Sequence, residues 1–114
     1  MTPEQQAYLQ DILDAARLVQ EYTAKMTGDE FLADVKTQDA VLRRFEIIGE
    51  AAAHLTDDTR ALFPDVPFHQ MRGMRNIIAH VYGEVDLTIV WRTVRDHLPG
   101  LIAHVAGQLG DGMV

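Results

Sequence analysis

The sequence predicts an all-α fold, a single helical bundle of about five helices. Apolar residues recur every three or four positions almost throughout the 114 residues, which is the period of an amphipathic helix. No stretch shows the apolar–polar alternation that marks a half-buried strand. The length fits one ordinary domain, and 47% hydrophobic residues suffice for one core. We therefore expect one helical domain over residues 1–110 and a frayed tail over residues 111–114.

The first helix is predicted to begin at Pro3. Thr2 is a good N-cap residue, and proline is favoured at the first helical position. We expect this helix to run to about Met26, where Thr27-Gly28 stops it. Its apolar side holds Tyr8, Ile12, Ala15, Val19 and Tyr22.

A second long helix is predicted in the middle of the chain, capped by Asp29 or Thr37 and ending near Leu55. Thr56-Asp57-Asp58 then opens a short helix that stops at Pro64. The apolar side of the long helix consists of Val41, Phe45, Ile48, Ala52 and Leu55.

The remaining helices are predicted from three capping signals. A helix is expected to start at Asp65-Val66-Pro67 and to end at Gly83. Asp86 is predicted to cap a further helix that buries Trp91. Pro99-Gly100 interrupts the helical pattern, which then continues over residues 101–109.

The composition excludes several classes of site. The chain has no cysteine, which excludes disulfides, thiolate metal sites and cysteine nucleophiles. It also has no serine, so a serine acyl-enzyme is impossible. There is no apolar run of about 18 residues and no secretory signal pattern, so we expect a cytoplasmic protein with no membrane span.

Charge is distributed unevenly along the chain. The net charge of −7 argues against broad electrostatic binding to nucleic acid. Between Asp65 and Glu84, however, there is no carboxylate, and this window holds two arginines and two histidines. Arginine is well suited to bidentate contacts with phosphate. We call residues 66–83 the cationic segment; its charged and titratable residues are His69, Arg72, Arg75 and His80.

A helical wheel separates the cationic segment into two sides. One side is apolar and holds Met71, Met74, Ile77, Ile78 and Val81, which we interpret as core or dimer contacts. The other side holds Arg72, Arg75, Asn76, Ala79, His80 and Gly83. A histidine of near-neutral pKa can move a proton to or from RNA hydroxyls, and an arginine can stabilise charge on phosphorus, without a metal. The alternative is that these polar residues are merely solvated.

The spacing Arg-x4-His is weak by itself, because the chain contains it twice. The extended pattern Arg-x4-His-x-Tyr is met only by Arg75, His80 and Tyr82. The second pair, Arg92 and His97, has a proline in the tyrosine position, and we interpret it as a chance match.

The stretch Arg75-Asn76-Ile77-Ile78-Ala79-His80-Val81-Tyr82 resembles the signature of HEPN-domain ribonucleases. It is most similar to the HepT branch, the toxins of HepT/MntA toxin–antitoxin pairs. Asn76 fits the polar position after the arginine, and Tyr82 fits the tyrosine that this branch adds. Residues 43–52, 84–91 and 98–99 also resemble parts of that branch, so the resemblance covers most of the chain.

The resemblance implies an all-α HEPN bundle that works as a homodimer, with the two motif helices facing a shared cleft. It implies metal-independent endoribonuclease activity that leaves a 2′,3′-cyclic phosphate. Arg75 and His80 would be catalytic, and Asn76 and Arg72 would support them. RNA, not DNA or a membrane, is then the expected partner. In a dimer, two cationic segments would double the local positive potential.

The resemblance also implies regulation by a second protein in a type VII-like toxin–antitoxin pair. A minimal nucleotidyltransferase antitoxin, similar to MntA, would silence the toxin by transferring AMP to Tyr82. The bulk and negative charge of the AMP group would then repel RNA phosphate near Arg75. The ATP and Mg²⁺ would belong to the antitoxin, so this chain needs no cofactor and no metal of its own.

Two other functions are open at this stage. The chain could be a non-catalytic helical interaction module that binds a nucleotidyltransferase. Alternatively, Glu46, Glu50 and His54 lie on one side of a helix and could form part of a metal–carboxylate site. We interpret these three mainly as a solvated stripe, although Glu50 could orient Arg75 or His80. His69, His97 and His104 are expected to be surface or packing residues.

Overall fold

The computed structural model describes residues 1–68, 71 and 86–110. All regular structure in these residues is helical, which confirms the predicted all-α class. The described helices are α1 (Pro3–Tyr22), α2 (Gly28–Leu32), α3 (Val35–Ala53), α4 (Asp57–Arg60), α6 (Leu87–Asp96) and α7 (Leu98–Leu109). These ranges alone hold one helix more than the five predicted. No described helix is long and apolar enough to cross a bilayer.

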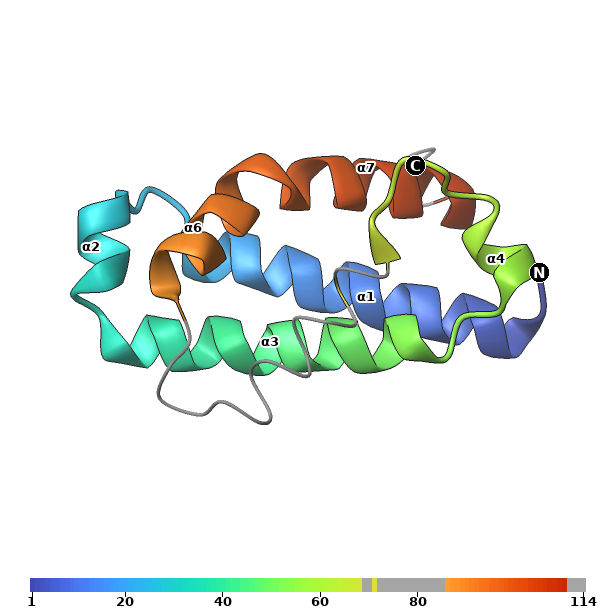
Figure 1. The fold of residues 1–114 in the computed structure, drawn as a ribbon, viewed down its shortest axis with the longest axis horizontal. Helices are drawn as coiled ribbons and strands as arrows, with labels where there is room; N and C mark the ends of the chain where they lie inside the picture. Colours follow the sequence, from blue (N-terminus) through green and yellow to red (C-terminus); the bar gives the residue numbers. More distant parts are fainter. Residues whose placement is uncertain (69–70, 72–85, 111–114) are drawn as a thin grey trace.

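The three long helices lie side by side, with α1 packed against both α3 and α7. Figure 1 shows the short helices at the two ends of this layer. Helices α2 and α6 contact each other at one end, and α4 lies beside the N-terminus at the other. One cluster of buried apolar residues runs through α1, α2, α3, α6, α7 and the segment after α4.

Helix α1 begins as predicted but ends earlier than predicted. The Thr2 side chain accepts a hydrogen bond from the Gln5 backbone N–H at 3.1 Å, and Pro3 starts the helix. The last helical residue is Tyr22 rather than Met26. The backbone of Lys25 takes the left-handed conformation, with φ at 63°, which an α-helix cannot continue through.

Thr27 is the N-cap of helix α2, whereas the sequence analysis interpreted Thr27-Gly28 only as the end of the preceding helix. Its hydroxyl accepts a hydrogen bond from the Glu30 N–H at 3.1 Å, and the Glu30 carboxylate accepts one from the Thr27 N–H at 3.0 Å. This reciprocal capping box opens α2, which the sequence analysis did not predict. The signal is present as Thr27-Gly28-Asp29-Glu30, but the glycine was interpreted only as a stop. The short helix serves to bury Phe31 completely.

Helix α3 is capped by Asp34, so the predicted caps Asp29 and Thr37 are both wrong. The Asp34 carboxylate accepts hydrogen bonds from the Thr37 N–H at 3.0 Å and from the Thr37 hydroxyl at 2.7 Å. These bonds favour the charged form and lower the pKa of the Asp34 carboxyl. Gln38 lies one turn further on, and its amide donates to the carbonyls of Phe31 and Leu32. The cap therefore joins α2 and α3 into one unit.

The later caps agree with the sequence, with one correction. Thr56 caps α4, and Asp86 caps α6 by accepting from the Thr88 N–H at 3.0 Å. Helix α7 begins at Leu98, so Pro99 lies in its first turn and does not interrupt a helix. Most of the helix predicted over residues 65–83 and the tail over residues 111–114 lie outside the described residues.

Trp91 belongs to the core, as predicted. It is half-buried, packs against the core cluster and stacks on Phe31 with ring centroids 5.1 Å apart. The Arg95 guanidinium carbon lies 5.7 Å from the centre of the indole on the same helix. A cation over an aromatic face is attracted by the ring quadrupole. These contacts join α6 to α2.

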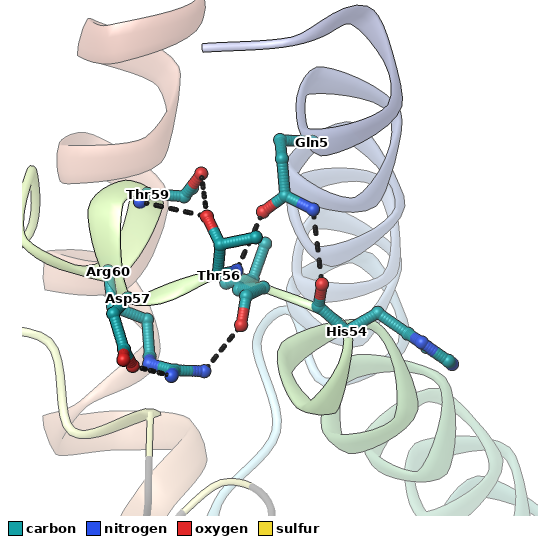
Figure 2. Close-up of polar contacts among 7 residues, drawn as sticks. Gln5, His54, Thr56, Asp57, Thr59 and Arg60 are labelled. Atoms are coloured by element: carbon teal, nitrogen blue, oxygen red, sulfur yellow. Dashed lines mark hydrogen bonds and ion pairs between the residues drawn. The ribbon is translucent and has the colours of Figure 1, made fainter.

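A clasp of hydrogen bonds joins the first turn of α1 to the end of α3 and the start of α4 (Figure 2). The amide of Gln5 donates to the His54 carbonyl at 3.1 Å and accepts from the Thr56 N–H at 2.9 Å. Arg60 adds hydrogen bonds to the Leu55 carbonyl and the Asp57 carboxylate. Gln5 is only 7% exposed, so both backbone groups depend on its amide.

We expect Gln5→Ala to lower the free energy of unfolding by about 2 kcal/mol, because it removes two part-buried hydrogen bonds that each contribute about 1 kcal/mol net. Urea denaturation measures the effect. Gln6→Ala is the matched control, since Gln6 is exposed on the same turn, and we expect it to change stability by less than about 0.5 kcal/mol. Equal effects of the two substitutions would show that the clasp does not hold α1 to α3.

Candidate functional site

The residues that the sequence analysis assigned to the site are Arg72, Arg75, Asn76, His80 and Tyr82, and they lie outside the described residues. Their roles stay predictions. The same holds for Met74 and His69. The described chain reaches the motif from both sides, ending at Met71 and resuming at Asp86. The site is therefore built from the described elements that carry these two ends.

A cavity of about 350 Å³ opens between α3, α6, α7 and the segment that follows α4. Most of its lining is apolar, and among the described residues none of the lining side chains is a carboxylate. The lining residues are Phe45, Ile48, Pro67, Met71, Ile89, Arg92, Thr93, His97, Leu98 and Leu101. The volume is in the range of small-molecule and cofactor sites.

Described residues on both sides of the motif stretch in the sequence, Met71 and Ile89, line this cavity. Met71 lines it and packs against the core, as the wheel predicted for this residue, and its N–H donates to the Pro67 carbonyl at 3.1 Å. At the other end, Asp86 stands three residues before Ile89, which also lines the cavity. Four residues of chain span at most about 14 Å, so Arg75 is tethered within that distance of Met71 in any conformation. The cavity is thus the described part of the molecule nearest the motif along the chain.

One side of α6 faces the cavity. Ile89, Arg92 and Thr93 are at positions i, i+3 and i+4, which share a side of a helix. The other side is anchored by Val90 and Val94, which are buried. The Thr93 hydroxyl donates to the Ile89 carbonyl at 2.9 Å, so its proton is already used. Because Val90 and Val94 hold one side of α6 in the core, the opposite side of the helix is held facing the cavity.

Arg92 and His97 both line the cavity, although the sequence analysis interpreted their spacing as a chance match. His97 is exposed, as expected, at the junction where α6 ends and α7 begins. The junction is held by two backbone bonds, from the His97 N–H to the Thr93 carbonyl and from the Leu101 N–H to the His97 carbonyl. The spacing alone does not reveal this arrangement, because it depends on how the two helices join.

The positive charge of this region extends beyond the cationic segment. Residues 66–95 carry four arginines against two carboxylates, a net charge of +2. Because the whole chain carries −7, all other residues together carry −9. Helix α6 contributes Arg92 and Arg95 to the positive region. Half of the eight arginines of the chain therefore lie in this stretch of sequence.

A second, shallower pocket of about 200 Å³ lies between α1 and α3. The rings of Tyr8 and His54 stack there with centroids 5.0 Å apart. The pKa of the Tyr8 hydroxyl is raised, first by desolvation and then by the carboxylate of Glu4, to which it donates a hydrogen bond. Asp11 and Glu50 complete an acidic surface, which does not suit a nucleic acid ligand.

The side chains of Glu46 and His54 are engaged with neighbouring residues rather than with each other. Glu46 pairs with Arg43 at 3.1 Å, and His54 stacks on Tyr8. Within residues 1–68, 71 and 86–110, no three histidine or carboxylate side chains are grouped closely enough to hold a metal ion. The interpretation of a solvated stripe therefore fits better than a metal–carboxylate site. The orienting role of Glu50 toward Arg75 or His80 stays a prediction.

Comparisons with known proteins agree on one family. A family model described as Ribonuclease HepT-like matches residues 12–106. A protein of Thermococcus cleftensis, named as a candidate ribonuclease HepT, is 42% identical over 94 residues, which cover 82% of this chain and 86% of that protein. A protein of Methanocaldococcus jannaschii, named as a candidate RNase, is 40% identical over 93 residues, which cover 82% and 85%. No solved structure matches this chain.

Proposed function

The chain belongs to the HepT-like ribonuclease family, and on this basis we propose that it is a metal-independent endoribonuclease acting as the toxin of a type VII-like toxin–antitoxin pair. One observation carries the proposal. The complete pattern Arg75-x4-His80-x-Tyr82 lies within the residues that the family model matches. An accessory module would have no chemical need to keep all three residues.

In the proposed reaction, His80 removes the proton from a ribose 2′-hydroxyl. The 2′-oxygen then attacks the adjacent phosphorus, and the bond from phosphorus to the 5′-oxygen of the next nucleotide breaks. That oxygen takes a proton from an acid, which we assign to the His80 of a second copy in a homodimer. The products are a 2′,3′-cyclic phosphate and a free 5′-hydroxyl. Arg75 stabilises the charge that develops on the phosphorane oxygens.

Asn76 and Arg72 support this chemistry in the proposal. Asn76 stands next to Arg75 and one turn before His80, where its amide orients either side chain. Arg72 binds a substrate phosphate. The net charge of −9 outside residues 66–95 repels RNA elsewhere on the molecule, so that binding concentrates at the motif.

The proposed antitoxin is a minimal nucleotidyltransferase that acts on Tyr82. The Tyr82 hydroxyl oxygen attacks the α-phosphorus of ATP bound to the antitoxin, and pyrophosphate leaves. The new phosphodiester adds a negative charge two residues from His80. That charge competes with RNA phosphate for the arginines, which silences the ribonuclease.

We expect expression of the unmodified protein alone to stop growth and fragment cellular RNA. Arg75→Ala and His80→Ala should do neither, because loss of a group that stabilises transition-state charge costs about 10²–10³-fold in rate and loss of a general acid–base group about 10²–10⁴-fold. Total RNA on a gel and growth curves measure the outcome. Arg43→Ala is the control that keeps activity, since the Arg43 side chain is 63% exposed and pairs, among the described residues, with Glu46.

Circular dichroism of the purified variants must show unchanged helix content. Intact RNA with wild-type protein whose Tyr82 carries no AMP would contradict the ribonuclease proposal. That result would favour the interaction module.

We expect EDTA to leave the cleavage rate of the purified protein unchanged, because proton transfer by His80 and charge stabilisation by Arg75 need no metal. The measurement follows a labelled RNA under single-turnover conditions. A rate that falls with EDTA and recovers with Mg²⁺ would refute the metal-independent mechanism.

We expect Tyr82→Phe to keep ribonuclease activity and to resist the antitoxin. After co-expression with the nucleotidyltransferase, intact-protein mass spectrometry should show one added AMP on wild type and none on Tyr82→Phe. Tyr22→Phe serves as the control that is still modified and silenced. An AMP adduct on the Tyr82→Phe protein would place the modification elsewhere.

A further inference from the structure

We propose that Arg92 and His97 bind a backbone phosphate of the RNA substrate, next to the phosphate that is cleaved. The inference rests on the proposed ribonuclease function and adds a binding point to it. Both side chains belong to described residues that line the same cavity as Met71, which stands four residues before Arg75 in the sequence.

The contacts of the two residues leave them available for a ligand. Arg43 and Arg60 are engaged by carboxylates, and Arg95 lies over the Trp91 indole. Within the described part of the chain, Arg92 and His97 have no hydrogen bond from their side chains and no ion pair. Arg92 is exposed, so its guanidinium is free to form the bidentate contact that phosphate favours.

The surroundings of the pair favour an anion. Besides Arg92 and His97, the described lining is apolar except for Thr93, whose hydroxyl proton bonds to the Ile89 carbonyl. The described residues that line the cavity include no carboxylate, although the exposed Asp96 is the sequence neighbour of His97. The first turn of α7, which starts directly after His97, has no side-chain cap, and its positive end adds to the attraction.

An RNA strand is the anion that this position suits. Met71 lines the cavity, and Arg72 and Arg75 follow it within four residues. A polyanion held at Arg75 and His80 extends past the site on either side, so neighbouring phosphates need positive partners. Among the described residues, Arg92 supplies such a charge at the cavity that Met71 also lines, and the His97 side chain adds a hydrogen-bonding group there. The phosphate binds at the rim, and the apolar floor has no part in holding it.

The test measures RNA binding without cleavage, in protein that carries His80→Ala. A fluorescein-labelled single-stranded RNA of mixed sequence is titrated by anisotropy at several salt concentrations. We expect Arg92→Ala to weaken binding by three- to tenfold at low salt. The slope of log Kd against log salt should fall by about 0.7, the value for one lost phosphate contact on a single strand. His97→Ala should weaken binding in the same direction.

Two matched variants distinguish an effect of the lost positive charge on RNA binding from an effect on folding. Arg95→Ala removes an arginine from the same helix, on the side that contacts Trp91, and should lower the salt slope less than Arg92→Ala does. Arg92→Lys keeps the charge and should retain most of the slope. In protein with an intact His80, Arg92→Ala should raise KM and leave kcat unchanged, because the contact is made equally before and during cleavage.

The outcomes of these measurements distinguish a failure of this inference from a failure of the proposed ribonuclease function. RNA binding with an unchanged affinity and salt slope in both Arg92→Ala and His97→Ala would overturn this inference and leave the ribonuclease intact. Unchanged RNA binding together with lost binding to the nucleotidyltransferase would also overturn it, and would assign the pair to a protein interface. Absence of RNA binding together with absence of cleavage by wild type would remove the proposed function and this inference with it.

Discussion

The described structure depends on the burial of α1 against two partners at once. Its apolar residues cover a broad side of the helix, and one neighbouring helix cannot cover all of them. Helix α3 covers one part of this apolar side and α7 covers the other part. Helices α3 and α7 themselves make few contacts with each other. The Gln5 amide sets the position of α1 along this arrangement by bonding to the backbone at the end of α3. Every other described helix is placed relative to this layer.

The cavity follows from the same constraint. Because α3 and α7 are held mainly through α1, space remains between them on the far side of the layer, where α6 and the segment around Pro67 close the rim. Helix α6 is in turn held by the contact between Trp91 and Phe31. A rigid two-sided helix thus produces an apolar hollow whose described lining includes Arg92 and His97. Met71, four residues before Arg75 in the sequence, also lines this cavity.

Helix caps could be predicted from the sequence, whereas contacts between residues far apart in the chain could not. Thr2, Thr56 and Asp86 were predicted as caps because a capping residue and the backbone it bonds lie within three positions. Helix α2 was missed because Gly28 supplies a stop signal inside a capping box. The Gln5 clasp joins residues about fifty positions apart, which no periodicity reports. The motif at Arg75, a purely linear pattern, came from the sequence, whereas the meeting of Arg92 and His97 at one cavity required the junction of α6 and α7.

Trp91 also gives the molecule an intrinsic optical label. It is the only tryptophan in the 114 residues, so all indole emission comes from one position. That indole lies between Phe31 and the guanidinium of Arg95, and a methyl group at Gly28 would come within 3.0 Å of its ring nitrogen. Emission intensity and wavelength therefore report the docking of α6, the helix that carries Arg92, onto α2. The quenching of this single fluorophore follows movements of α6 relative to α2 in unlabelled protein and in real time.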